Sequence, residues 1–409
     1  MEKEQKMQIL QDLVAIHSVN GDELPVAKYL KKLLDDAGIK NEILPLKNEA
    51  NRANLVAELG SGKPVLVISG HMDTVDVNKD NWETDPFKVT KKGDKLYGRG
   101  TTDMKAGLAA MVIAMVELKE SGAAIPGTIR LLATAGEEVG QPGAEELQKQ
   151  GYVDDADALL IGEPSGLFRT VFANKGELDL TISSEGKTAH SSMPFLGNNA
   201  VEHLLNVLDA IKKRIKELTA GVKNDILGET VFNIDTIKGG NQVNAIPNHA
   251  EAELNLRTIP ELANPTILQE FQAVIDDYNN STNGHIKMSV DMDIVPIIGN
   301  RDSKLLKVVQ DAGRPYIAKQ DIPAAQLALM QKEAQIANTE YHEGGFLTEG
   351  VSGGTDGSKF LIKHPTGFEY LVYGPGSDTP HQDNEYISEQ MYLDFVDIYK
   401  QIFTNYGRD

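Results

Sequence analysis

The sequence predicts an α/β fold, in which a mostly parallel, twisted sheet is flanked by helices and carries an inserted α+β domain. Three observations predict this fold. Uniformly apolar runs recur along the first part of the chain, helical patterns alternate with them, and from about residue 176 the strand patterns alternate between polar and apolar residues. Apolar runs are typical of strands buried on both faces, whereas alternation is typical of strands with one exposed face.

The first domain is predicted from the apolar runs. Residues 64–69, 128–134 and 158–161 have the pattern of buried strands, and residues 104–120 that of a long helix, apolar around much of its circumference. Strands that alternate with helices favour a parallel sheet. In such sheets ligands bind at the carboxyl ends of the strands, so we expect functional side chains there.

The inserted domain is predicted from its order of elements. Strands are expected at residues 177–183, 231–237, 250–258 and 286–295, and helices at residues 199–218 and 265–278. This β-α-β-β-α-β order is that of the ferredoxin-like unit. We therefore expect a first domain made of residues 1–175 and 294–409 and an inserted domain made of residues 176–293.

Composition excludes several classes of function. The chain has 409 residues, 41% of them hydrophobic, and no apolar run approaches the roughly 18 residues that a membrane span needs. The 40 Lys and Arg against 60 Asp and Glu give a net charge of −20, which would repel a nucleic-acid backbone. Without cysteine, a metal must be held by nitrogen and oxygen atoms. We expect a cytoplasmic protein with no membrane or nucleic-acid partner.

His71 and Asp73 form a His-x-Asp unit directly after the first buried strand. On extended backbone, side chains two positions apart share a face. Asp73 can therefore accept the second ring N–H of His71 and fix the tautomer that binds a metal.

Asp103 follows a turn that contains Gly98 and Gly100, and it opens the predicted helix. A helix start favours an ionised carboxylate, which a ligand that bridges two cations requires. A simple N-cap role would explain the same position. A dinucleotide-binding fingerprint is disfavoured because Asp103 stands where its third glycine would be.

Further carboxylates and a histidine come from other glycine-containing segments. Glu137 and Glu138 are adjacent in a glycine-flanked turn, so one can ligate metal while the other handles protons. Glu163 is expected in a stiffened turn before Pro164, and His381 in a loop near the C-terminus. This set of imidazoles and carboxylates suits a two-metal hydrolytic site better than a structural role.

Together these segments resemble the metal-dependent hydrolases of the acetylornithine deacetylase and succinyl-diaminopimelate desuccinylase family, with related aminoacylases and glutamate carboxypeptidases. The resemblance spans nearly the whole chain and rests on residues 70–75, 97–107, 135–138, 162–164, 189–194, 239–247, 353–357 and 380–381. It implies two divalent ions, zinc in the first place, with cobalt or manganese as alternatives. It implies that one ion is held by His71, Asp103 and Glu163, the other by Asp103, Glu138 and His381, and that Glu137 is the general base, with Asp73 beside it in the catalytic set.

The resemblance also implies that the inserted domain is a lid that forms a homodimer. His190 matches a histidine that such a domain supplies to the neighbouring subunit's site, and Asn244 and Arg257 match residues that grip a substrate carboxylate. Gly354 and Thr355 are expected to contact substrate as well. From the residues alone, a structural ion pair explains Arg257 equally well.

Hydrolysis of an amide bond in a small N-acyl amino acid or dipeptide is the activity that the resemblance implies. The pattern is most similar to succinyl-diaminopimelate desuccinylases of lysine and diaminopimelate biosynthesis, although their Gly-Thr-Ser-Asp-Gly stretch is shortened here to residues 354–357. Alternatives are acetylornithine deacetylase, another deacylase of N-acyl amino acids, and a dipeptidase or carboxypeptidase. Outside this class stand a dinucleotide-dependent enzyme and a non-catalytic binding module on the same fold.

Overall fold

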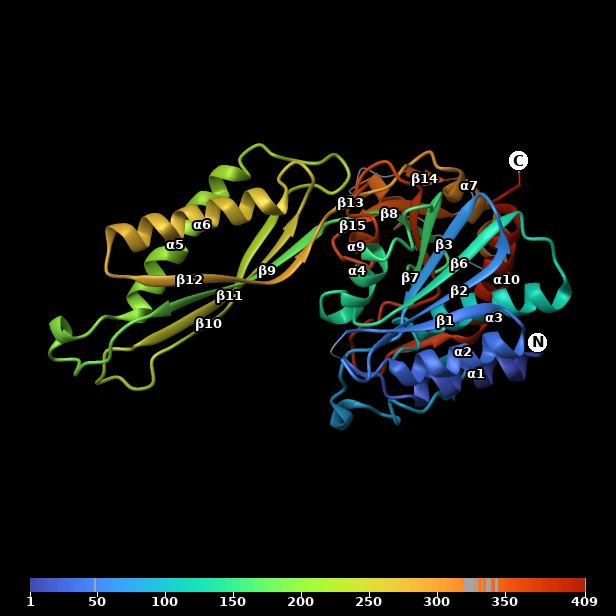
Figure 1. The fold of residues 1–409 in the computed structure, drawn as a ribbon, viewed down its shortest axis with the longest axis horizontal. Coiled ribbons are helices and arrows are strands. Elements are labelled where there is room, and N and C mark those ends of the chain that lie inside the picture. The colour runs from blue at the N-terminus through green and yellow to red at the C-terminus, as the bar shows by residue number, and fades with distance from the viewer. Residues whose placement is uncertain are drawn as a thin grey trace. The chain divides into compact units, whose positions relative to one another are not determined.

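A ten-stranded, a four-stranded and a three-stranded sheet organise the part of the chain that the structure describes (Figure 1). This computed structural model describes residues 1–47, 49–319 and 345–408, and between the last two ranges residues 328, 330–332, 334–335 and 340–342. The chain divides into two compact units. Unit 1 comprises Met1–Ala173, Ile298–Gly350 and Thr355–Asp409, and unit 2 comprises Asn174–Ile297 and Val351–Gly354.

The large sheet of unit 1 has the strand order β1-β2-β6-β3-β7-β16-β8-β15-β14, with β13 paired to β8. Its strands are β1 (Lys40–Pro45), β2 (Ala53–Ser61), β3 (Val65–His71), β6 (Gly127–Thr134), β7 (Ala158–Pro164), β8 (Arg169–Asn174), β13 (Ile297–Ile298), β14 (Glu340–His342), β15 (Phe346–Val351) and β16 (Tyr370–Gly374). The central strands β6, β3, β7 and β16 run parallel to one another. Every residue of β3 is buried. The uniformly apolar runs thus correctly predicted a mostly parallel sheet.

The helices of unit 1 pack around this sheet. They are α1 (Lys3–Ala15), α2 (Leu24–Asp36), α3 (Lys105–Ser121), α4 (Pro142–Lys149), α7 (Lys304–Ile317), α9 (Gly357–Phe360) and α10 (Glu389–Asn405). Helix α3 contacts β3 and β7 and also α1, α2 and α10, which explains why it is apolar around its circumference. At Gly107 a Cβ atom would lie 2.2 Å from the Gly162 carbonyl oxygen, so a glycine is needed where α3 meets β7. None of the described helices has the length and apolar composition needed to cross a bilayer.

A small sheet joins two distant segments of unit 1. It consists of β4 (Thr90–Lys92), β5 (Lys95–Tyr97) and β17 (Tyr386–Ser388) in the order β17-β5-β4. Tyr386 pairs with Tyr97 across β17 and β5. This pairing brings the segment after His381 beside the loop that leads to Asp103.

Unit 2 is the predicted β-α-β-β-α-β arrangement. Its elements are β9 (Gly176–Glu185), η3 (Pro194–Leu196), α5 (Ala200–Leu218), β10 (Val231–Gly239), β11 (His249–Thr258), α6 (Asn264–Ser281) and β12 (His285–Ile294). The strands lie in the order β10-β11-β9-β12, all antiparallel. Helices α5 and α6 lie on the same side of this sheet (Figure 1). Alternate residues of β9, namely Leu178, Leu180 and Ile182, are buried in the core beneath the helices.

Candidate metal centre

The candidate ligands of unit 1 lie where the parallel strands end. His71 is the last residue of β3, and Glu137 and Glu138 form a short 3-10 helix, η2 (Glu137–Val139), soon after β6. Glu163 belongs to β7 itself, because that strand continues to Pro164; the sequence had predicted a turn there. Strands that run parallel present their carboxyl ends at one edge of a sheet, so these side chains are brought together.

His71 turns one ring nitrogen toward carboxylates and the other toward the backbone. Its Nε2 lies 2.9 Å from Asp103 Oδ1 and 3.4 Å from Glu163 Oε1. Its Nδ1 lies 3.0 Å from the backbone oxygen of Asp73, to which a proton on Nδ1 would be donated. The expected acceptor was the Asp73 side chain, whose Oδ1 is 3.5 Å from Nδ1. The backbone carbonyl therefore takes that role and leaves Nε2 free to bind a metal.

The Asp73 carboxylate shapes the neighbouring glutamate turn instead. Its Oδ1 accepts hydrogen bonds from the backbone N–H groups of Gly136 at 3.0 Å and Glu137 at 3.2 Å, and its Oδ2 accepts one from Glu138 at 3.2 Å. Burial alone would raise the pKa of Asp73, but the contact with His71 lowers it below its ordinary value. Asp73 therefore connects the end of β3 to the turn that carries both glutamates.

Asp103 stands between the two imidazoles of the site. Its Oδ1 lies 2.9 Å from His71 Nε2, and its Oδ2 lies 3.3 Å from His381 Nε2. The prediction that Asp103 opens the helix was wrong, because α3 begins at Lys105 and its N-cap is Met104. The Asp103 N–H donates to Glu385 Oε1, at 2.9 Å. Burial opposes the effect, but the two imidazoles hold the pKa of Asp103 well below its usual range.

His381 joins the cluster from the C-terminal segment. Its Nε2 lies 2.9 Å from Glu138 Oε2, and its backbone adopts φ 61°. Hydrogen bonds to Asp103 and Glu138 raise the pKa of His381 to about 10.

The cluster contains two overlapping groups of possible ligand atoms. One atom each from His71, Asp103 and Glu138 lie within 4.8 Å of one another, and the same holds for His71, Glu137 and Glu163. Burial and neighbouring carboxylates raise the pKa of Glu137 and that of Glu163 well above the ordinary value. Crowding of buried carboxylates is costly unless cations compensate it. Imidazole nitrogen and carboxylate oxygen are ligands of zinc, so the residues fit divalent ions.

Two buried carboxyl groups near this cluster, those of Asp356 and Glu385, were not predicted as site residues from the sequence. Asp356 Oδ2 accepts a hydrogen bond from Thr134 Oγ1 at 2.5 Å, whereas its Oδ1 is buried without a hydrogen-bond partner among the described residues. Burial raises the pKa of Asp356 to about 7. Glu385 is fully buried beside the loop of Asp103. The glycines before Asp356 were a usable signal, whereas Glu385 looks in the sequence like its exposed neighbour Asp383.

The predicted substrate residues of unit 2 lie in two loops and one strand. The His190 ring is exposed, with Nδ1 at 2.7 Å from Ser192 Oγ, and the Ser191 N–H donates to the Asn244 backbone oxygen. Arg257 on β11 is paired with Glu177 on β9, with both guanidinium distances at 2.6 Å. The structural ion pair that the sequence left open for Arg257 is therefore present.

Gly354 and Thr355 fall on opposite sides of the boundary between the units. A Cβ atom added at Gly354 would have the Ile294 side chain as its nearest neighbour, at 3.5 Å. The Thr355 hydroxyl is buried in unit 1, where it lies 2.8 Å from the Tyr370 hydroxyl and accepts from the Gly357 N–H at 3.2 Å. Its hydrogen-bonding capacity is thus used within the core.

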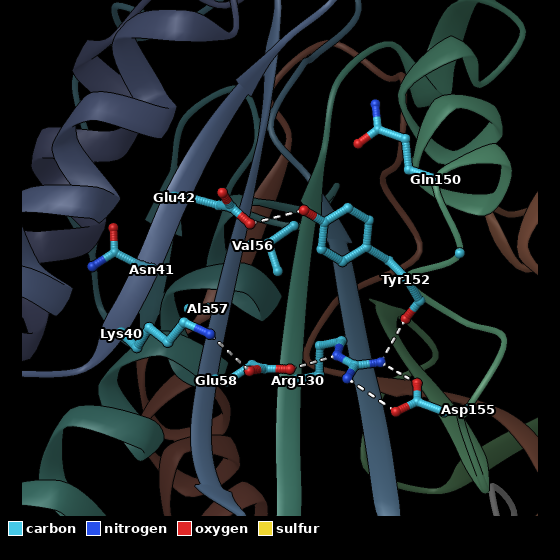
Figure 2. Close-up of a pocket in the computed structure, with 11 residues that line it drawn as sticks. Lys40, Asn41, Glu42, Val56, Ala57, Glu58, Arg130, Gln150, Tyr152 and Asp155 are labelled. Atoms are coloured by element: carbon cyan, nitrogen blue, oxygen red, sulfur yellow. Dashed lines mark hydrogen bonds and ion pairs between the residues drawn. The ribbon is translucent and has the colours of Figure 1, made fainter.

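A cavity of about 520 Å³ on the outer strands of unit 1 is separate from this centre (Figure 2). Its charged groups are paired with one another: Arg130 Nε donates to Glu58 at 2.8 Å, and Arg130 Nη1 donates to Asp155 at 2.5 Å. Tyr152 donates to Glu42 at 2.8 Å. None of the candidate metal ligands lines it. This network ties β2 and β6 to the segment before β7.

Comparison with known proteins identifies relatives over the whole chain. The model of peptidase family M20/M25/M40 matches residues 67–405. A probable succinyl-diaminopimelate desuccinylase of Staphylococcus aureus strain MRSA252 is 38% identical over 431 aligned positions, which cover 100% of this chain and 98% of that protein. An acetylornithine deacetylase of Pasteurella multocida is 30% identical over 276 positions, which cover 66% of this chain and 70% of that protein.

Solved structures share the fold. A tripeptidase from Staphylococcus aureus superposes with a TM-score of 0.74 at 22% identity, with 100% of both chains covered. A Bacillus subtilis protein described as a dinuclear metal-binding peptidase superposes with a TM-score of 0.63 at 16% identity, with 98% of this chain and 97% of that chain covered. These likenesses support the two-unit α/β architecture.

Proposed function

The chain belongs to peptidase family M20/M25/M40 and is a hydrolase of amide bonds, and we propose that it removes the succinyl group from N-succinyl-LL-diaminopimelate with two metal ions. The observation that carries the proposal is the position of the Asp103 carboxylate, 2.9 Å from His71 and 3.3 Å from His381. A carboxylate with one oxygen toward each imidazole can serve two ions at once. The choice of substrate is supported by the 38% identity to a probable desuccinylase.

Zinc is the metal we propose. His71, Asp103 and Glu163 would hold one ion, and Asp103, Glu138 and His381 the other. These nitrogen and oxygen donors suit zinc, while cobalt and manganese accept the same ligands. When bound, such a pair of ions activates water and polarises the scissile carbonyl.

Glu137 is the residue that we propose as the general base. It would take a proton from the attacking water and deliver it to the leaving amine. Its Oε1 accepts a hydrogen bond from Gln141 Nε2 at 3.0 Å, which orients the carboxylate. Asp73 supports this role, because its bonds to the backbone of residues 136–138 set the direction in which Glu137 leaves the turn.

Unit 2 is proposed as the lid and the dimerisation domain, with residues 1–175 and 294–409 as the catalytic domain of a cytoplasmic enzyme. His190 would donate a hydrogen bond to the oxyanion of a partner subunit's substrate, and Asn244 and Gly354 would contact the substrate. Arg257 would bind a substrate carboxylate, which must then replace Glu177 as the partner of the guanidinium group. Thr355 would act from the core, through the backbone beside Gly354.

A substrate panel tests the proposal. Zinc-reconstituted protein is assayed on N-succinyl-LL-diaminopimelate, N-acetylornithine and simple dipeptides, with ninhydrin detection of the freed amine. We expect the highest kcat/KM for the succinyl compound. A preference for N-acetylornithine or a dipeptide would show that the proposed substrate is wrong and that the proposed reaction, amide hydrolysis, is right. Failure to release amine from any of them, by protein that carries its ions, would contradict the proposed function.

A further inference from the structure

The carboxylate of Glu385 is fully buried and receives four hydrogen bonds from one loop. Its Oε2 accepts from Arg99 Nη1 at 2.6 Å and from the Gly100 N–H at 3.1 Å. Its Oε1 accepts from the N–H groups of Thr102 at 2.6 Å and Asp103 at 2.9 Å. The loop from Arg99 to Asp103 is therefore wrapped around a single side chain.

Glu385 comes from the same segment as His381, so it joins two ligand-bearing loops. The Gly98 N–H donates to the Glu385 backbone oxygen at 3.0 Å. Beside it, Thr102 Oγ1 donates to the Tyr386 backbone oxygen at 2.5 Å, and Ser377 Oγ donates to the same oxygen at 2.7 Å. The loop of Asp103 is thereby held against the segment from Ser377 to Tyr386, which carries His381.

We propose that Glu385 is a positioning residue, which sets the Asp103 carboxylate and the His381 ring at the separation needed to hold a metal ion jointly. It acts through the backbone of Asp103 and through the chain that connects it to His381, and it touches neither substrate nor metal. This inference rests on the proposed metal centre.

The chemistry of the site requires a carboxylate. All four of its partners are donors, and bonds from donors to an ionised acceptor are stronger than those to a neutral one. An amide at this position would turn an NH₂ group toward one pair of these donors, because Gln has a single acceptor oxygen. Asp383, in the same loop, shows the contrast: it is exposed and accepts from Asn81 Nδ2 at 2.9 Å.

The test compares metal binding by the Glu385→Gln variant with binding by a remote control. Glu117 on α3 is a second largely buried carboxylate with cationic partners, Lys6 and Lys400, and lies far along the helix from Asp103. Metal-free wild type, E385Q and E117Q are titrated with zinc in competition with a chromophoric chelator. Thermal unfolding of each metal-free protein is measured in parallel.

We expect E385Q to bind the ion shared by Asp103 and His381 about 10- to 100-fold more weakly, as loss of a supporting partner typically does. E117Q should lose stability and keep wild-type affinity for both ions. A folded E385Q with wild-type affinities, or an equal weakening in E117Q, would overturn the proposal. If E385Q does not fold, E385D is tested in its place. The shorter side chain of E385D keeps the charge but cannot reach both pairs of donors. Wild-type affinities for both ions in E385D would therefore also overturn the proposal. A wild type that binds no zinc would instead contradict the proposed function.

Discussion

His381 Nε2 lies 2.9 Å from Glu138 Oε2, although 243 positions separate the two residues in the chain. The contact joins the C-terminal loop to η2, the short 3-10 helix after β6, and His381 Nε2 also lies 3.3 Å from Asp103 Oδ2. The His381 side chain lies between two carboxylates and is 55% exposed. A metal ion can therefore reach the ring from solvent and displace its proton.

Removal of the His381 ring should therefore abolish the binding of one ion and leave the other ion bound. For His381→Ala we expect zinc content to fall from about two ions per chain to about one, because three protein ligands are typical of such sites and only two would remain. Elemental analysis after dialysis measures the content. The exposed His364, in the same unit, provides the control His364→Ala, which should retain both ions.

Glu137→Gln separates proton transfer from metal binding. The amide cannot accept a proton, so turnover should fall by about 10²- to 10⁴-fold while both ions stay bound. Steady-state kinetics with parallel metal analysis checks this. Glu146→Gln is the matched control, because Glu146 lies on α4 and accepts an exposed helix-surface bond from Gln150. Equal losses in both variants, or loss of zinc in E137Q, would count against the assigned role.

Asp73→Asn should disturb the turn that carries Glu137 and Glu138, because the backbone of that turn donates to the Asp73 carboxylate. The amide keeps one acceptor oxygen and turns an NH₂ group toward N–H donors of residues 136–138. We expect zinc affinity or kcat to fall by about 10- to 100-fold. Zinc titration and kinetics measure this loss. An unchanged variant would show that the turn holds Glu137 without Asp73.

His190→Ala tests the role proposed for unit 2. Loss of an oxyanion donor should lower kcat by about 10²- to 10³-fold with little change in KM. Ser192→Ala removes only the hydroxyl that lies 2.7 Å from His190 Nδ1, so it should have a smaller effect of the same kind. Steady-state kinetics measures kcat and KM of both variants relative to wild type. Wild-type kcat in H190A would remove the residue from the mechanism.

Acid stability should depend on Glu117. Burial opposes the shift, but hydrogen bonds from Lys400 and Lys6 lower the pKa of Glu117 from 4.5 to about 2. A lowered native pKa adds stability above the unfolded-state value, and this contribution is lost as pH falls from about 4.5 toward 2. The stability difference between wild type and E117Q, from urea unfolding, should thus be constant above pH 5 and shrink below it. A difference that grows on acidification would contradict the sign.

The sequence predicted what local periodicity and strand ends determine. Uniform apolar runs identified β3, β6 and β7, and the alternation of β9 identified unit 2. Pairings over long separations were out of reach: Glu385 with Arg99, and Arg257 with Glu177, depend on how distant strands align. The Asp103 error has a local cause. An acid before a helix resembles an N-cap, but the Asp103 carboxylate faces His71 and His381, and the helix begins later, with Met104 as its N-cap.

Anomalous diffraction at the zinc edge, from crystals of reconstituted protein, locates each bound ion relative to Asp103. We expect two peaks per chain, one beside His71 and Glu163 and one beside Glu138 and His381, with Asp103 in contact with both. A single peak, or a pair in which Asp103 contacts neither ion, would contradict this expectation.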